Sequence, residues 1–283
     1  MKIGILGATG YVGSRLTTLA RESGHEPIPF SRLERPGHRL VAPAGKLDFS
    51  GLDAVVNLAG EPILGLWTRE KRRRILQSRV DGTKRIAAHL GDGPRIWINA
   101  SAVGFYGDTG DGAVDESSPA GRGFLADVCR EWESATRSAE EACVRVVRLR
   151  IGFVTGPGGA MRLVRPVFQA GLGGPLGSGR QWMSCIHVDD VAGMILWSIS
   201  NGEISGAVNA VLPEPVRNID FTKSLAHAVG RPAIFPAPAF LLKTLLGDLS
   251  HVLLDSVRVR PQVALQHGYP FRHPTLDQAL RAL

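Results

Sequence analysis

The chain has 283 residues, which is enough for one large domain or for two lobes. Its composition, with 44% apolar and 21% charged residues, is ordinary for a globular protein. No apolar run approaches the ~20 residues that a membrane-spanning helix needs, and "MKIGILG" at the start reads as a strand, so we expect neither a membrane partner nor a secretory leader. Three widely spaced cysteines favour neither a disulfide framework nor a zinc site, which indicates a reducing, cytoplasmic setting and no metal.

The formal net charge of +7 suits either nucleic acid or small anionic ligands. The densest basic run, "REKRRR" at 69–74, lies in a segment with helical apolar spacing. Successive helical residues are about 100° apart, so Lys71 and the three arginines after it fan around the helix instead of forming one stripe. We therefore expect a solvated helix and no nucleic-acid partner.

Strands and helices alternate through the first 150 residues. "KIGILG" leads into a helix over "YVGSRLTTLARESG", and "PIPFS" is the next strand. "DAVVNLAG", "RIWINASAVG" and "VRVVRLRIGFV" are apolar runs of the type buried on both faces of a parallel sheet. The pattern predicts an α/β, Rossmann-type, doubly wound parallel sheet for residues 1–150.

The composition of the sequence changes after residue 151, where glycine and proline concentrate in predicted loops such as "TGPGGAMRLVRP". We expect residues 151–283 to form mainly a smaller, C-terminal α+β lobe that binds substrate. The helix near 187–200, "HVDDVAGMILWSIS", is the exception, since it reads as a helix that returns to the first domain.

Three glycines, Gly7, Gly10 and Gly13, follow the first predicted strand and open the first predicted helix. A dinucleotide pyrophosphate needs this placement, because glycines let the backbone approach the phosphates. The helix N-terminus adds unpaired N–H groups and a positive dipole. We therefore predict a bound nicotinamide cofactor.

The end of the second strand distinguishes the two nicotinamide cofactors. An Asp or Glu about 20 residues after the glycines typically grips a free 2′-hydroxyl, whereas a 2′-phosphate needs a basic residue. The segment "PIPFSRLERPG" has no acid at the strand end, and Ser31 and Arg32 occupy the turn. The Arg32 guanidinium can donate two hydrogen bonds to a phosphate, and the Ser31 hydroxyl can donate another. We therefore predict NADP(H). The alternative is that Arg32 is an ordinary exposed turn residue.

A resemblance to a known family strengthens this interpretation. "GATGYVG", "VVNLAG", "SRVDGT", "SAVGFYGD", "RLRIGFVTGPGG" and "CIHVDDVA" are similar, in order and spacing, to the extended short-chain dehydrogenases, the NAD-dependent epimerase/dehydratase family. "NLAGEPI", "FLADVCREWE", "GLGGPLGSGRQW" and "RVRPQVALQHGYPF" resemble its atypical branch, often labelled nucleoside-diphosphate-sugar epimerase or cell division inhibitor. The resemblance implies a Rossmann domain, a small C-terminal substrate lobe and a cleft between them.

The resemblance also implies which residues surround the cofactor. His187, in the "HVDD" segment, reads as a helix-start residue more than as a base. With Ser31 and Arg32 added from the strand-end argument, the predicted cofactor-binding set is Gly7, Thr9, Gly10, Tyr11, Val12, Ser31, Arg32, Leu58, Ala59, Gly60, Ala100, Ser101 and Arg150.

The sequence departs from the family in its chemistry. The family's acid–base pair is Tyr-x-x-x-Lys, whose lysine holds the nicotinamide ribose and lowers the pKa of the tyrosine. No Tyr-x-x-x-Lys occurs anywhere in this chain. The family helix aligns with "FLADVCREWE", which puts Leu125 at the tyrosine position and Cys129 at the lysine position. Neither side chain can replace its counterpart at neutral pH.

Three other residues are candidates for proton transfer. Tyr106 lies in the "GFYGD" loop, Ser101 is one residue away from the family's serine or threonine position, and Glu61 follows "NLAG" at the carboxyl end of a strand. Burial can tune the pKa of such groups. Packing or loop roles for Tyr106 and Glu61 are the open alternatives. Trp182, beside Arg180, reads equally as a stacking surface for a ligand and as a residue between the lobes.

Two functions fit these observations. The first is an NADP(H)-dependent oxidoreductase or epimerase-like enzyme with a non-standard acid–base group and a small, anionic or nucleotide-linked substrate. The second is a non-catalytic NADP(H)-binding regulatory or interaction protein, which the missing Tyr-x-x-x-Lys favours. The retained cleft motifs and substrate lobe favour the enzyme. The oligomeric state does not follow from the sequence.

Overall fold

The computed structural model describes residues 1–41, 47–91 and 93–281. Seven parallel strands form its main sheet, in the order β11-β7-β5-β4-β1-β2-β3. This order confirms the predicted Rossmann-type, doubly wound sheet. The strands are β1 (Lys2–Leu6), β2 (Glu26–Ser31), β3 (Arg39–Leu40), β4 (Ala54–Asn57), β5 (Ile96–Ala102), β7 (Arg145–Ile151) and β11 (Gly206–Ala210).

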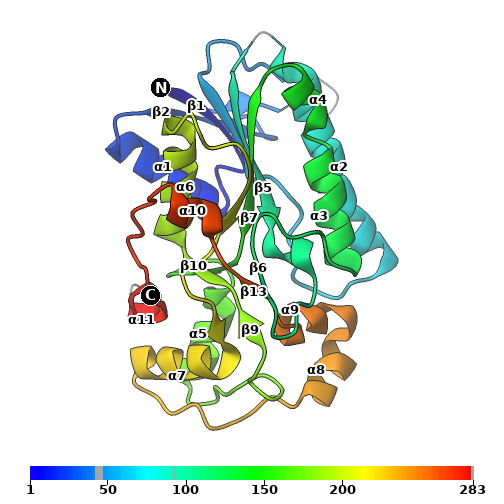
Figure 1. The fold of residues 1–283 in the computed structure, drawn as a ribbon, viewed down its shortest axis with the longest axis vertical. Helices are drawn as coiled ribbons and strands as arrows, with labels where there is room; N and C mark the ends of the chain where they lie inside the picture. The colour runs from blue at the N-terminus through cyan, green and yellow to red at the C-terminus, as the bar shows by residue number, and fades with distance from the viewer. Residues whose placement is uncertain (42–46, 92, 282–283) are drawn as a thin grey trace.

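Helices cover both faces of this sheet (Figure 1). Helices α1 (Tyr11–Glu22) and α6 (Val188–Ser200) pack together on one face. Helices α2 (Arg69–Leu90), α3 (Phe124–Ser134) and α4 (Arg137–Glu141) lie on the other. Alternate strand residues therefore supply two cores, as in β5, where Ile98 packs toward the first face and Trp97 toward the second. The apolar runs are buried on both faces, as their composition indicates.

Most of the chain after residue 151 forms smaller units at one end of the main sheet, in the lower part of Figure 1. A separate core there contains Met161, Phe168, Phe221 and Leu225. The strands are β8 (Phe153–Thr155), β9 (Trp182–Met183), β10 (Cys185–His187), β12 (Val216–Arg217) and β13 (Arg258–Val259). The helices are α5 (Met161–Gln169), α7 (Asn218–Val229), α8 (Ala239–Leu246), η2 (Gly247–Ser250), α9 (His251–Leu254), α10 (Gln262–Gln266) and α11 (Leu276–Arg281).

The two parts of the chain are interleaved. Helix α6 and strand β11 come from beyond residue 151 and complete the main sheet unit. In the opposite direction β6 (Ala113–Val114), which follows the short helix η1 (Val103–Tyr106), pairs with β13. The chain therefore crosses the predicted domain boundary near residue 150 several times. The division into two domains at this position stays a prediction. Within the described ranges, no helix is long and apolar enough to span a membrane.

Candidate functional site: the carboxyl edge of the main sheet

The sheet register brings the predicted cofactor-binding segments together. Leu6 pairs with Phe30 and with Asn57, and Asn57 pairs with Asn99. The residues that follow these partners therefore meet at one edge, where β1, β2, β4 and β5 end. In doubly wound folds this carboxyl edge is where ligands bind.

The glycine loop between β1 and α1 is held by close backbone contacts. Gly7 has a φ of +80°, and a Cβ built there would lie 2.7 Å from the carbonyl carbon of Leu58. A Cβ on Gly13 would lie 2.9 Å from the Cα of Ala8 and closer still to the Gly7 carbonyl oxygen. Among the described residues, no side chain caps the N-terminus of α1 after Gly10. Its first N–H groups can therefore bind an anion.

Ser31 and Arg32 lie beside this loop, at the end of β2. The Ser31 hydroxyl accepts a hydrogen bond from the Leu33 N–H at 3.1 Å, which shapes the turn. The Arg32 side chain is exposed, and it has no ion pair or hydrogen bond with any residue that the structure describes. Its guanidinium is available to a ligand phosphate.

Buried amides shape the segment after β4. Asn57 donates to the side-chain oxygen of Asn99 at 2.8 Å, and its own oxygen accepts from the Ala59 N–H at 3.2 Å. These contacts fix the path of Leu58, Ala59 and Gly60. Sequence reasoning missed the two asparagines, although a polar residue inside an apolar strand was the available signal.

A buried polar network joins the ends of β5, β7 and β11. The Ser101 hydroxyl and the Arg150 Nε both donate to Glu133 Oε1, at 2.6 and 2.8 Å, and Arg150 Nη2 donates to Glu133 Oε2 at 2.9 Å. Arg150 Nη1 donates to the Tyr106 hydroxyl at 2.8 Å, which in turn donates to Asn209 Oδ1 at 2.8 Å. Three predicted site residues thus share one network with Glu133, which sequence reasoning did not identify.

Tyr106 keeps its proton at neutral pH. Its side chain is 3% exposed, and burial raises the pKa of Tyr106 to about 12 even though the Arg150 guanidinium opposes the shift. The ring also packs edge-on against Phe105, at 5.3 Å between centroids. The hydroxyl is therefore a hydrogen-bond donor held in place from two sides.

Helix α3 presents Leu125 and Cys129 where the family pattern has its acid–base pair. Leu125 is half-buried against Gly104. Cys129 is 3% exposed, and burial, with a smaller contribution from the charge of Glu133, raises the pKa of its thiol to about 12. The sulfur stays protonated at neutral pH and cannot stand in for a cationic lysine.

Glu61 differs from these buried groups, because its side chain is partly exposed. Lys71 Nζ donates to Glu61 Oε1 at 2.8 Å, and this hydrogen bond lowers the pKa of Glu61. Its N–H donates to the Ser78 hydroxyl at 3.0 Å, which ties the loop after β4 to helix α2. Glu61 is thus an ionised carboxylate just beyond the predicted cofactor-binding segment.

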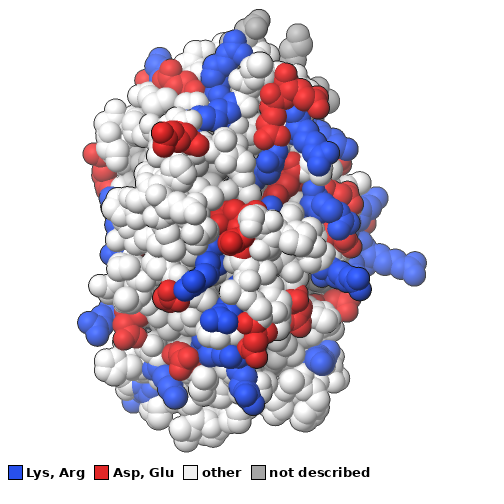
Figure 2. Space-filling view, in the orientation of Figure 1, with Lys and Arg blue, Asp and Glu red and all other residues white. Residues whose placement is uncertain are grey.

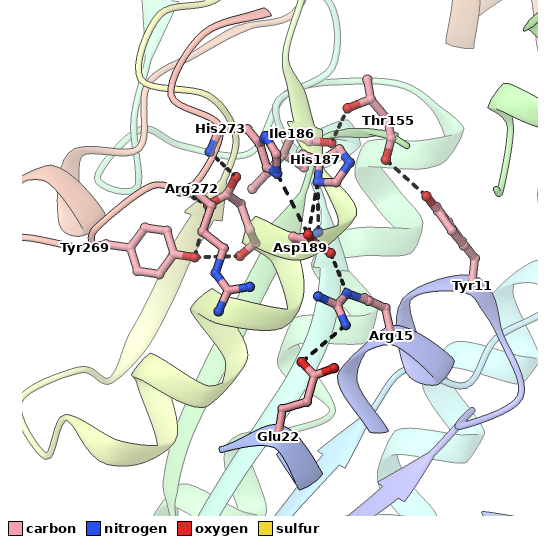
Figure 3. Close-up of polar contacts among 11 residues, drawn as sticks. Tyr11, Arg15, Glu22, Thr155, Ile186, His187, Asp189, Tyr269, Arg272 and His273 are labelled. Atoms are coloured by element: carbon pink, nitrogen blue, oxygen red, sulfur yellow. Dashed lines mark hydrogen bonds and ion pairs between the residues drawn. The ribbon is translucent and has the colours of Figure 1, made fainter. Parts of the chain in front are cut away.

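Tyr11 and α1 are anchored to the start of α6 (Figure 3). The Tyr11 hydroxyl donates to the Thr155 carbonyl at 3.3 Å, and its ring packs against the glycines of the 156–159 loop. Arg15 Nε donates to Asp189 Oδ1 at 2.5 Å. His187 is the N-cap residue of α6, because its Nδ1 accepts from the Asp189 N–H at 3.2 Å.

The C-terminal segment is tied to the same place (Figure 3). The Asp190 carboxylate accepts from the N–H groups of Arg272 and His273, at 2.7 and 3.0 Å. The rings of His273 and His187 lie 4.0 Å apart, and ligand atoms of these histidines and Asp189 come within 4.8 Å of one another. Such a set can hold a metal ion, but Arg15 already pairs with Asp189 and the His187 Nδ1 serves as the helix cap.

Trp182 is enclosed by the chain's own groups. Arg217 and Arg258 stack over its ring, at 4.1 and 4.3 Å from the centroid, and its indole N–H donates to Asp111 at 3.0 Å. Of the two interpretations of this tryptophan, these contacts support the residue between the lobes.

Four of the five basic side chains in the run at 69–74 of α2 are paired with acids. Lys71 and Arg74 contact Glu61, Arg73 contacts Glu70, and Arg72 contacts Asp248 across the lobes. Figure 2 shows basic and acidic side chains interspersed on the visible face, without a continuous basic stripe there. The pairing agrees with the solvated-helix interpretation.

Comparison with known proteins agrees with this geometry. The model of the NAD dependent epimerase/dehydratase family matches residues 3–210, well over half of the chain. The chain belongs to this family. A second model, a domain of unknown function (DUF1731), matches residues 237–283. The resemblance found in the sequence motifs is thereby confirmed.

Relatives in the family match the chain over its whole length. The chloroplastic homolog of epimerase family protein SDR39U1 from Arabidopsis thaliana is 37% identical over 304 residues, covering 100% of this chain and 86% of the relative. The crystal structure of human epimerase family protein SDR39U1 (isoform2) with NADPH has a TM-score of 0.92 at 32% identity, covering 99% of this chain and 98% of the human one. MoeE5 in complex with UDP-glucuronic acid and NAD shares the fold, with a TM-score of 0.76 at 22% identity, covering 100% of this chain and 97% of MoeE5.

Proposed function

We propose that the chain binds NADP(H) at the carboxyl edge of its main sheet. The observation that carries the proposal is the pairing of an uncapped glycine loop with Ser31 and Arg32 at the end of β2, where an acid would select NAD(H). The NADPH in the crystal structure of the human relative supports the same cofactor.

The other predicted cofactor-binding residues fit this placement. The N–H groups near Gly10, Tyr11 and Val12 would hold the pyrophosphate, and Arg32 the 2′-phosphate. Arg150 contributes indirectly, because its guanidinium fixes Glu133 and Tyr106 between β5 and β7. Of the remaining residues of the set, Thr9, Leu58, Ala59 and Gly60 follow strand ends at the same edge, and Ala100 and Ser101 lie in the carboxyl-terminal part of β5.

We further propose an oxidoreductase or sugar-nucleotide epimerase-like activity, on a small anionic or nucleotide-linked substrate. The cofactor would supply hydride transfer, while the chain orients both ligands and moves a proton. Among the predicted catalytic residues, Glu61 has the ionised and partly exposed carboxylate, and release of its ion pair with Lys71, which lowers its pKa, would make it a better proton acceptor. The contacts of Ser101 and Tyr106 suit them to positioning the edge of β5.

A non-catalytic NADP(H)-binding protein is the second candidate. One specific set of observations favours it: Leu125 is apolar, and the pKa of both Cys129 and Tyr106 is raised to about 12 by burial. None of these groups exchanges a proton readily near neutral pH. Binding of NADP(H) would then be the whole function. The contacts between the sheet unit and the C-terminal lobe would transmit the bound state.

One assay separates the two candidates. NADPH is mixed with a panel of sugar nucleotides and carbonyl compounds, and its absorbance is followed. Because epimerisation consumes no cofactor, the sugar nucleotides are also analysed for epimerised product. Substrate-dependent oxidation or epimerisation that is lost in Arg32→Ala and in Glu61→Gln supports the enzyme. A blank across the panel, with NADPH binding intact by calorimetry, supports the binding protein.

The proposal also covers the cellular location and the partners of the protein. We propose a cytoplasmic protein with a small-molecule ligand and with neither nucleic acid nor a membrane as partner, on the basis of its cysteine usage and its paired basic helix. The chloroplastic relative shows that other compartments occur in the family. Fractionation of the native cell tests the location.

A further inference from the structure

One arginine of α2 lies beside the place from which the family's lysine is missing. Helices α2 and α3 pack against each other, and Cys129 on α3 occupies the lysine position. Arg79, in the middle of α2, stacks its guanidinium over Trp132 of α3, at 5.1 Å from the ring centroid. A cation is therefore present next to this part of α3, but it comes from a different helix.

The Arg79 guanidinium also contacts the segment that follows β4. A Cβ built on the exposed Gly60 would lie 3.3 Å from Arg79 Cζ, so the guanidinium lies close beside Gly60 and leaves little room for a side chain there. Arg79 Nη1 donates to the Glu61 carbonyl at 3.0 Å and to the Ile75 carbonyl at 3.2 Å. These two bonds hold the guanidinium in one orientation against the edge of the predicted cofactor site.

The remaining donors of Arg79 are uncommitted. In residues 1–41, 47–91 and 93–281, no acceptor is bonded to Nε or Nη2, and no carboxylate oxygen lies within ion-pair distance. The Glu61 carboxylate forms its ion pair with Lys71 instead. Glu61 is near enough for its charge to act on Arg79, but a half-buried cation without a direct ion pair is costly, so this arrangement suits a ligand that supplies oxygen acceptors.

The charge of the Arg79 guanidinium also acts on the Cys129 thiol. Burial raises the pKa of Cys129, and the positive charge of Arg79 is among the effects that oppose this shift. Burial lowers the pKa of Arg79, but an arginine remains charged at neutral pH. The thiol stays neutral, so it does not compensate the charge of Arg79.

We propose that Arg79 replaces the missing lysine as the cation that binds the nicotinamide-side ribose of NADP(H). The assignment rests on the proposed cofactor. The guanidinium fork can donate to both hydroxyls of a ribose bound beside Gly60, where the family resemblance implies that the cofactor runs. With Leu125 on α3 there is no tyrosine for this cation to activate, so cofactor binding is retained without the family's acid–base pair.

Calorimetry with two ligands tests the assignment. NADP⁺ contains the nicotinamide ribose, whereas adenosine 2′,5′-bisphosphate contains only the phosphorylated adenosine half. For Arg79→Gln we expect NADP⁺ affinity to fall about 10-fold to 100-fold, while affinity for the bisphosphate changes less than about 2-fold. Arg79→Lys, which keeps the charge without the fork, should recover part of the loss. Arg73→Gln, an exposed arginine on the same helix paired only with Glu70, is the matched control and should change neither affinity.

Each other outcome is decisive. Equal losses for both ligands in Arg79→Gln would assign Arg79 a purely structural role, and unchanged NADP⁺ affinity would place the ribose elsewhere; either result overturns the assignment alone. A wild-type chain that binds neither ligand overturns the proposed function and the assignment with it. If Arg79→Gln does not fold, Arg79→Lys carries the test, with a smaller loss expected for NADP⁺ only.

Discussion

The glycine loop and helix α3 lie at the same edge of the sheet but differ in what they keep of the family pattern. The loop keeps each backbone feature that a pyrophosphate requires: Gly7 at positive φ, Gly13 in close contact with Ala8, and an uncapped helix N-terminus. Helix α3 keeps its packing but carries Leu125 and Cys129 at the acid–base positions. Cofactor binding depends on backbone shape, whereas proton transfer depends on two side chains, so one can persist without the other.

The first test of this comparison removes the buried ion pair between Glu133 of α3 and Arg150 of β7. Arg150→Leu leaves the carboxylate of Glu133 buried without its partner, and we expect a loss of about 3–5 kcal/mol in the free energy of unfolding. Urea denaturation measures it. Arg130→Ala, which removes an exposed pair on the same helix, should cost less than about 1 kcal/mol. Similar losses for both variants would contradict the structural role of the network.

Gly13→Ala tests the other region. The new Cβ meets the backbone of Gly7 and Ala8, so the glycine loop must shift. We expect a loss of about 1–3 kcal/mol in the free energy of unfolding, together with the loss of NADPH binding. Gly82→Ala is the matched control, because a Cβ there meets nothing within 4 Å, and it should stabilise helix α2 by up to about 1 kcal/mol. A Gly13→Ala variant that binds NADPH normally would be inconsistent with a tight pyrophosphate loop.

Arg32→Ala sharpens the identity of the cofactor. Loss of one charged hydrogen-bond donor to the 2′-phosphate should weaken NADPH binding about 10-fold to 100-fold and leave NADH binding unchanged. Arg21→Ala, at the exposed last turn of α1, serves as the control. An equal loss for both cofactors would mean that Arg32 does not contact the 2′-phosphate.

The smallest effect concerns the tyrosines, whose pKa is raised at all three positions, chiefly by burial. Because the folded-state pKa of Tyr106, about 12, lies above the unfolded value, the stability that its neutral form contributes is complete below pH 10 and is lost as the pH rises toward 12. The phenolate absorbance near 295 nm should therefore be weaker for the folded protein at pH 10 than for the protein unfolded in urea at the same pH. A folded-state tyrosine that titrates near neutral pH would instead support Tyr106 as the acid–base group.

Sequence reasoning predicted the elements whose signals are local. The glycines after β1, the apolar runs of β4, β5 and β7, and the turn at Ser31 are each visible within a dozen residues. The network around Glu133 and Arg150 was not predictable in this way, since its members come from five separate elements up to 108 positions apart in the chain (from Ser101 to Asn209). The return of β11 to the main sheet likewise follows from long-range pairing with β7, which no local pattern encodes.

Titration of the purified chain with NADPH and with NADH, by calorimetry, tests the central claim most directly. The account predicts measurable NADPH binding that is at least about 10-fold tighter than NADH binding, as expected for a charged contact to the 2′-phosphate. Equal or tighter binding of NADH would contradict the role of Arg32, and no binding of either nucleotide would contradict the whole account.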